Sequence, residues 1–224
     1  MTTSKHNETT GDPNLGPDHA KDLESLDAHI TQHWGASPEV LHEIYSEYVH
    51  IDLYVVPATP TRPFHSVITA GMSHKPMTVP PGYEHCRYCE LVIALPMDWP
   101  IDKEHFADEK NWWPFRQLKQ AARFPHASGS GLWYGHTIAN EDPPESFAQG
   151  IQFCAGIISI PSLCPREAWM LIVRPDKEVY FFSFLPIYRS ELDHAREHGS
   201  DALFERLDEL DVTELIQRNR PKAV

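Results

Sequence analysis

The sequence predicts an α+β domain in which helices pack on a mostly antiparallel or mixed sheet of about six strands. Three observations indicate this class: strand-like apolar segments in the middle of the chain, amphipathic helical patterns at both ends, and no internal repeat. A chain of 224 residues can form one large domain or two small ones, and no linker interrupts its middle. We therefore expect a flexible tail over 1–20 and a single domain over 21–220.

The domain is expected to begin with an amphipathic helix over 21–34. Its apolar residues recur at helical spacing: Leu23, Leu26, Ile30 and Trp34. Gly35 follows in the position of a C-terminal cap, which predicts the end of this helix. Ser37 and Pro38 then have the order of a cap and a first helical residue, which predicts a further short helical turn.

Strand patterns fill the centre of the chain. They cover six segments: 49–56, 64–70, 87–95, 151–160, 168–173 and 178–185. The first segment alternates with a period of two, so that His50, Asp52 and Tyr54 share one face and the apolar residues share the other. Pro175-Asp176-Lys177 separates the last two segments and predicts a hairpin.

Helical patterns return after the third and the last strands. Pro114 is expected to occupy the first position of a helix that runs toward Phe124. A helix over 190–198 should end at Gly199, and Ser200 should cap a final helix. The inward face of that final helix is predicted from its apolar residues: Leu203, Phe204, Leu207 and Leu210.

The charge balance separates classes of partner. The chain has 19 Lys and Arg against 32 Asp and Glu, a net charge of −13, and no basic cluster, which argues against nucleic-acid binding. Six acids against one Arg lie between Asp201 and Glu214, and this excess can serve solubility or match a basic partner. No apolar stretch is long enough for a membrane span and no signal peptide is present, so we expect a cytoplasmic protein with reduced thiols.

Three short motifs suggest catalysis or metal binding, but their contexts argue against it. His194-Ala195-Arg196-Glu197-His198 has the inverted zincin pattern, yet little chain follows to supply a third zinc ligand. Cys86 and Cys89 have the spacing of a zinc half-site that Cys154 and Cys164 could complete to four sulfur ligands, but residues three apart on a strand point to opposite faces. The loop 128–131 lacks the spacing of a nucleophile elbow or a phosphate loop. We therefore expect no metal and no cofactor.

One set of polar and aromatic residues remains as a candidate site. His126 and His136 flank Trp133 and Tyr134, while Glu90 lies in the middle of a predicted strand. Together with the polar face of the first strand, these side chains could form a structural network, the floor of a binding groove, or a metal or acid/base centre. The partner-binding candidates are His50, Asp52, Tyr54, Glu90, His126, Trp133, Tyr134 and His136.

An ordered series of motifs resembles the Suppressor of Fused family over roughly residues 40–210. The series consists of His50-Ile51-Asp52-Leu53-Tyr54-Val55-Val56-Pro57, Arg62-Pro63-Phe64, Thr69-Ala70-Gly71-Met72-Ser73, Glu90-Leu91-Val92-Ile93-Ala94-Leu95-Pro96, Trp113-Pro114, Leu118, Ala122-Arg123-Phe124-Pro125-His126, Trp133, Gly135-His136-Thr137-Ile138, Pro161 and Leu185-Pro186-Ile187-Tyr188. Its spacing is typical of the bacterial branch of the family.

The resemblance implies a protein that binds another protein and is not an enzyme. Animal members hold transcription factors by adding an extended peptide to a sheet, and the bacterial branch is proposed to include immunity proteins that neutralise toxins exchanged between cells. We therefore expect a cytoplasmic immunity or sequestering protein with a toxin domain or extended peptide as partner. The alternative is a metal-dependent or His-based hydrolase that uses His126 and His136.

Overall fold

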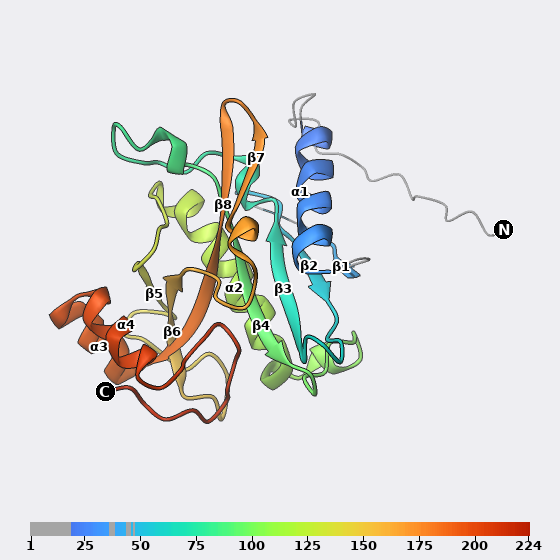
Figure 1. Cartoon of the computed structure of the whole chain (residues 1–224). Coiled ribbons are helices and arrows are strands. Elements are labelled where there is room, and N and C mark those ends of the chain that lie inside the picture. The colour runs from blue at the N-terminus through green and yellow to red at the C-terminus, as the bar shows by residue number, and fades with distance from the viewer. Residues whose placement is uncertain (1–18, 36–38, 44–45, 47) are drawn as a thin grey trace.

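The computed structural model describes residues 19–35, 39–43, 46 and 48–224. Its centre is an eight-stranded sheet of order β1-β2-β3-β4-β8-β6-β5, and β7 pairs with β8 outside this order (Figure 1). The β4–β8 pair is parallel and the other pairs are antiparallel. The predicted α+β class with a mixed sheet is confirmed, although eight strands replace the expected six.

The secondary structure bounds are as follows. The strands are β1 (Glu39–Leu41), β2 (Asp52–Val56), β3 (Phe64–Ala70), β4 (Cys89–Pro96), β5 (Thr137–Ala139), β6 (Phe153–Ser159), β7 (Met170–Arg174) and β8 (Lys177–Tyr188). The α-helices in the described ranges are α1 (His19–His33), α2 (Glu109–Ser128), α3 (Arg189–His198) and α4 (Ser200–Asp208).

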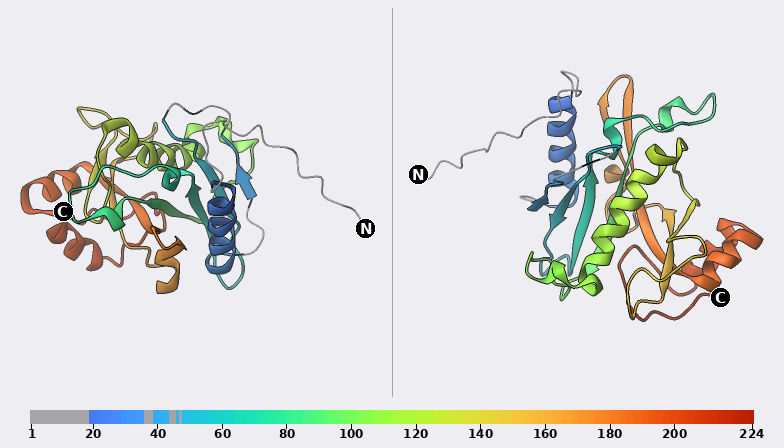
Figure 2. Two further views of the ribbon diagram at one scale, coloured as in Figure 1. Left: turned by 90° about the horizontal axis from the view of Figure 1, so that it is seen from above. Right: turned by 180° about the vertical axis from the view of Figure 1, so that it is seen from behind.

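The helices form layers on both faces of the sheet (Figure 2). Successive side chains of a strand point to opposite faces, so Phe182 and Phe184 of β8 pack into the core under α2. Phe181 packs with α1 on the other face, and Leu185 packs there with α3 and α4. Side chains of β8 therefore pack against the helices on both faces of the sheet.

The helix α2 begins earlier than the sequence predicts. It starts at Glu109 because Asp108 caps it: the Asp108 carboxylate accepts a hydrogen bond of 2.9 Å from the Lys110 backbone N–H. Pro114 therefore lies inside the helix, not at its first position. Extending the helix ahead of the proline buries Trp113 completely, and this burial offsets the backbone hydrogen bond that proline cannot donate.

Other boundaries also differ from expectation. Ser200 is the first residue of α4 rather than its cap, and Leu210 is exposed because α4 ends at Asp208. The short strands β1 and β5 were not predicted. Most of the expected tail over 1–20 and the expected turn at Ser37 and Pro38 lie outside the described residues.

Candidate protein-binding groove

One edge of β8 is paired by two different strands, and a gap separates them. β6 pairs with Ser183–Tyr188, and β7 pairs with Lys177–Tyr180. Phe181 and Phe182 lie between these two stretches, and on this edge no strand of the described chain pairs with them. We call this gap the notch.

The chain between β6 and β7 explains why the notch is not closed. This segment contains Pro161 and Pro165, which have no backbone N–H to donate to a strand. The buried Glu214 holds the segment in a loop instead, since its carboxylate accepts hydrogen bonds from the backbone N–H groups of Ser162 at 3.1 Å and Leu163 at 2.8 Å. The backbone N–H groups of Ser162 and Leu163 are thus satisfied without pairing to β8.

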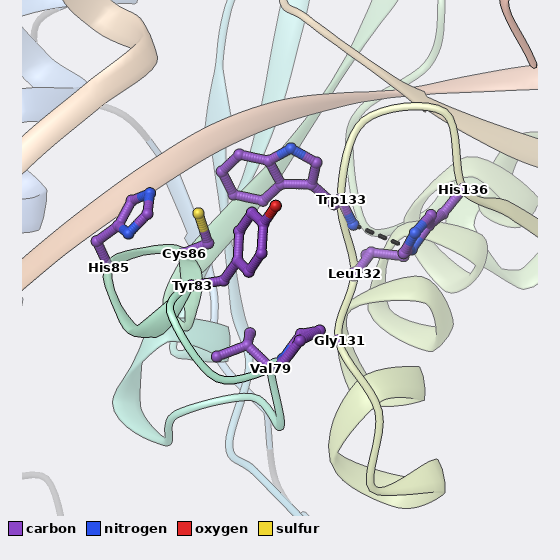
Figure 3. Close-up of a pocket in the computed structure, with 9 residues that line it drawn as sticks. Val79, Tyr83, His85, Cys86, Gly131, Leu132, Trp133 and His136 are labelled. Atoms are coloured by element: carbon purple, nitrogen blue, oxygen red, sulfur yellow. Dashed lines mark hydrogen bonds between the residues drawn. The ribbon is translucent and has the colours of Figure 1, made fainter.

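A pocket of about 490 Å³ opens at the notch. Its walls include Trp133, Tyr134, Trp169 and Tyr180, together with Phe181 and Phe182 of the notch itself. A second pocket of about 340 Å³ adjoins it and is lined by residues that include Tyr83, Cys86, Trp133 and His136 (Figure 3). We call them the notch pocket and the loop pocket, and the two together the groove.

Trp133 forms a wall shared by both pockets. Its indole ring meets the rings of Tyr180 and Phe182 edge to face, with centroid distances of 5.2 and 4.8 Å. Edge-to-face contacts of this kind favour one ring orientation. Trp133 is therefore held between the two pockets by β8 underneath it.

Two loops enclose the loop pocket, one over 76–86 and one over 129–136 (Figure 3). They touch where the Thr78 N–H donates to the Ser130 carbonyl at 3.2 Å. A Cβ on Gly131 would lie 2.9 Å from the Thr78 carbonyl oxygen, so a larger residue would push the loops apart. The Trp133 backbone N–H donates to Nδ1 of His136 at 3.2 Å and closes the turn beneath the indole.

Large apolar side chains are unusually exposed around the groove. Tyr83 is 58% exposed at the loop pocket, and three residues of the notch pocket are similarly open: Tyr134 at 38%, Ile160 at 41% and Met170 at 39%. Contiguous exposed apolar surface of this kind marks interaction sites on soluble proteins. The arrangement supports binding of apolar groups more readily than acid/base chemistry.

Three of the eight predicted site residues line the groove: Trp133, Tyr134 and His136. His126 does not line it. The Nε2 atom of His126 lies 3.0 Å from the Met72 carbonyl oxygen, and burial lowers the pKa of this imidazole. His126 and His136 thus make separate contacts with backbone groups.

Glu90 lies in a buried network beside His126. Its carboxylate accepts hydrogen bonds from the Thr69 hydroxyl at 2.5 Å, the Gly71 N–H at 2.9 Å, and both the N–H and the hydroxyl of Ser73 at 2.9 and 2.7 Å. Burial raises the pKa of Glu90, and these hydrogen bonds oppose the rise. The geometry joins β4 to the turn after β3.

The polar face of β2 divides into two environments. The Asp52 carboxylate lies 2.9 Å from Nδ1 of His42 and 2.9 Å from Nε2 of His50, and it accepts the Glu43 N–H at 2.8 Å. Tyr54 instead packs in the core under α1, and burial, followed by nearby Asp27, raises its pKa. His50, Asp52 and Tyr54 line neither pocket.

The described residues contain no group of three or more His, Cys, Asp or Glu side chains placed to hold a metal ion. Cys86, Cys89 and Cys154 are buried free thiols, and Cys164 is half-buried. No helix among these residues is long and apolar enough to cross a membrane.

Sequence reasoning missed several walls of the groove, among them Tyr83, Trp169 and Met170. The pair of prolines between two apolar strands was a signal for a break in the sheet. Nothing in the local pattern, however, places the loop over 76–86 beside Trp133.

The chain forms an α+β domain with an open groove on its sheet. A family model described as Suppressor of fused protein (SUFU) matches residues 47–221, and the chain therefore belongs to this family. The resemblance noted from the sequence motifs is confirmed. A search of curated proteins found no match.

Solved structures of the family share the fold. A SUFU homolog from Neisseria gonorrhoeae FA 1090 matches with a TM-score of 0.63 and 17% identity, over 92% of this chain and 96% of that chain. A chain of the Sufu-Fu complex matches with a TM-score of 0.63 and 15% identity, over 90% and 92%. Drosophila Suppressor of Fused matches with a TM-score of 0.57 and 14% identity, over 89% of this chain and 50% of that chain.

Proposed function

We propose that this chain is a non-catalytic protein-binding domain that receives an extended segment of a partner in the groove. The observation that carries the proposal is the position of Trp133 between two open pockets rimmed by exposed apolar side chains. One matched family structure is described as the Sufu-Fu complex, so this fold occurs in a complex with a protein.

The shape of the groove suits a peptide segment. Each pocket can take an apolar side chain, and a single indole separates the two pockets. Alternate side chains of one extended segment, which point the same way, can therefore enter both. Tryptophan and tyrosine are enriched among the residues that dominate binding energy at interfaces. Trp133 and Tyr134 are therefore the proposed anchors of the complex.

We further propose that the partner is a protein toxin and that the chain acts as an immunity or sequestering factor in the cytoplasm. The resemblance to the bacterial branch supports this role, and the net charge of −13 suits association with a basic protein. The remaining candidates, His50, Asp52, Tyr54, Glu90 and His126, are proposed to support the fold around the groove.

The proposal is tested by pull-down with the product of the neighbouring gene and by a toxin challenge in cells. We expect Trp133→Ala to weaken the complex by about 2 kcal/mol or more, roughly 30-fold, by calorimetry. The matched control is Met97→Ala, an exposed apolar residue just beyond β4 that lines neither pocket. Thermal unfolding shows whether both variants fold.

Two results would overturn the proposal. One is failure to recover any partner together with no protection in the challenge. The other is a folded Trp133→Ala variant that binds a recovered partner as tightly as the unmodified protein does.

A further inference from the structure

Tyr134, which lines the notch pocket, packs on the helix α4. The ring of Tyr134 stacks on the ring of Phe204 with centroids 4.7 Å apart and an interplanar angle of 20°. The next residue, Gly135, touches the start of α4 so closely that a Cβ there would lie 2.5 Å from the Ser200 hydroxyl oxygen. A segment that contacts Tyr134 is thus also beside α4.

The part of α4 next to Tyr134 is negatively charged. Asp201 and Asp208 are three residues before and four residues after Phe204, so all three share one face of the helix. Burial, followed by the charges of Asp201 and Asp208, raises the pKa of the Tyr134 hydroxyl, which agrees with their proximity. Glu205 is also exposed on this helix.

These carboxylates are available to a partner. Among the residues that the structure describes, no ion pair involves Asp201, Glu205 or Asp208, and the nearby Arg206 pairs with Glu209 at 3.1 Å. Arg166 also lines the notch pocket, but its guanidinium lies over the Trp169 ring at 5.6 Å. A cation on a bound segment is therefore favoured on the α4 side of the pocket rather than over Trp169.

We propose that the groove recognises a basic segment, with one apolar side chain in the notch pocket and neighbouring lysine or arginine residues over the carboxylates of α4. The inference rests on the proposed function and specifies the chemistry of the partner. Charge complementarity carries it, since an apolar pocket with unpaired carboxylates beside it selects apolar residues adjoined by cations.

The test is selection of phage-displayed random peptides on the full chain, followed by sequencing. Four proteins are compared: the unmodified chain, Asp201→Asn with Asp208→Asn, Trp133→Ala, and a control with Asp98→Asn and Glu104→Gln. The control removes two exposed acids beyond the end of β4, outside both pockets. All substituted carboxylates are exposed, and circular dichroism checks that each variant folds.

We expect the unmodified chain and the control to select peptides with an aromatic or large aliphatic residue beside Lys or Arg. The protein with Asp201→Asn and Asp208→Asn, called the α4 variant, should still select peptides with an apolar residue. It should no longer select peptides enriched in Lys or Arg. A selected peptide, measured by fluorescence polarisation at low ionic strength, should bind the α4 variant about 3- to 10-fold more weakly. Added salt should weaken its binding to the unmodified chain more than its binding to the variant.

The outcomes separate the two proposals. If the α4 variant selects as many basic peptides as the unmodified chain, the inference fails, but the proposed protein-binding function of the groove stands. If Trp133→Ala selects the same peptides as the unmodified chain, or if no protein selects any peptide, the proposed function fails and the inference fails with it.

Discussion

Replacement of Glu90 by alanine should strongly destabilise the fold. The Glu90 carboxylate is wholly buried and accepts the backbone N–H groups of Gly71 and Ser73, each at 2.9 Å. Without it, these two donors stay buried with no acceptor, and each such group costs about 1–3 kcal/mol. The free energy of unfolding should therefore fall by about 2–6 kcal/mol, before any cost of the cavity left by the side chain.

Replacement of Glu90 by glutamine removes the charge but keeps most of the hydrogen bonds, so it separates the two effects on stability. A glutamine carbonyl can occupy the position of Oε1 and keep three of the four bonds. Its amide group then faces the Thr69 hydroxyl, which can act as acceptor in place of donor. At neutral pH we expect Glu90→Gln to lower the free energy of unfolding by at most about 2 kcal/mol, less than Glu90→Ala does.

The pH dependence follows from the raised pKa of Glu90. A carboxyl whose pKa is higher in the folded protein than in the unfolded chain binds its proton more tightly when folded. Its contribution to stability is fully present below the unfolded pKa and is lost as the pH rises through the folded pKa. The stability advantage of the unmodified chain over Glu90→Gln should thus be larger near pH ~5 than near pH ~8.

Urea unfolding followed by tryptophan fluorescence measures these differences across the pH range. Glu39→Ala, an exposed carboxylate on the edge strand β1, is the matched control and should change stability by no more than about 0.5 kcal/mol. An advantage over Glu90→Gln that grows toward high pH would refute the reasoning, because it would mean that the four donors outweigh burial and lower the pKa.

Three further stability predictions concern separate parts of the fold. Arg220→Met leaves the buried Glu191 carboxylate without its cation and should cost about 3–5 kcal/mol in urea unfolding, whereas a loss under about 1 kcal/mol would show that water replaces the arginine. Gly156→Ala places a Cβ 2.0 Å from the Phe184 ring, so Tm by calorimetry should fall by several degrees; an unchanged Tm would contradict this contact. Asp108→Ala removes the cap of α2 and should cost about 1 kcal/mol by thermal circular dichroism, with no loss arguing that the cap is dispensable.

The fold could be predicted from sequence where one periodic pattern was long enough to dominate. The strand β3 has the predicted bounds, 64–70, because a seven-residue segment with aromatic and β-branched residues ends at Gly71, whose backbone adopts a positive φ of 126°. The strands β1 and β5 have three residues each, too few to show a period of two. They exist because a neighbouring strand supplies their hydrogen bonds, which is a tertiary effect.

The candidate site could be predicted only in part, for a similar reason. Proximity in sequence explains the part that was predicted. Because Trp133, Tyr134 and His136 lie within four positions of the chain, a groove that contains one of them is expected to contain the others. Glu90 and Tyr54 are polar residues on strands, and the same pattern fits a groove floor or a buried network. Burial decides between these, and burial depends on α1 and on the turn after β3.

The groove itself follows from how two strands share β8. A single long strand along this edge would have paired with Phe181 and Phe182 and left no opening. Pro161 and Pro165 prevent such a strand, and Glu214, arriving from the C-terminal segment, supplies the acceptors that the interrupted chain requires. The local sequence thus contains the reason for the break. Its use as a binding surface depends on Trp133, which a different part of the chain brings over the opening.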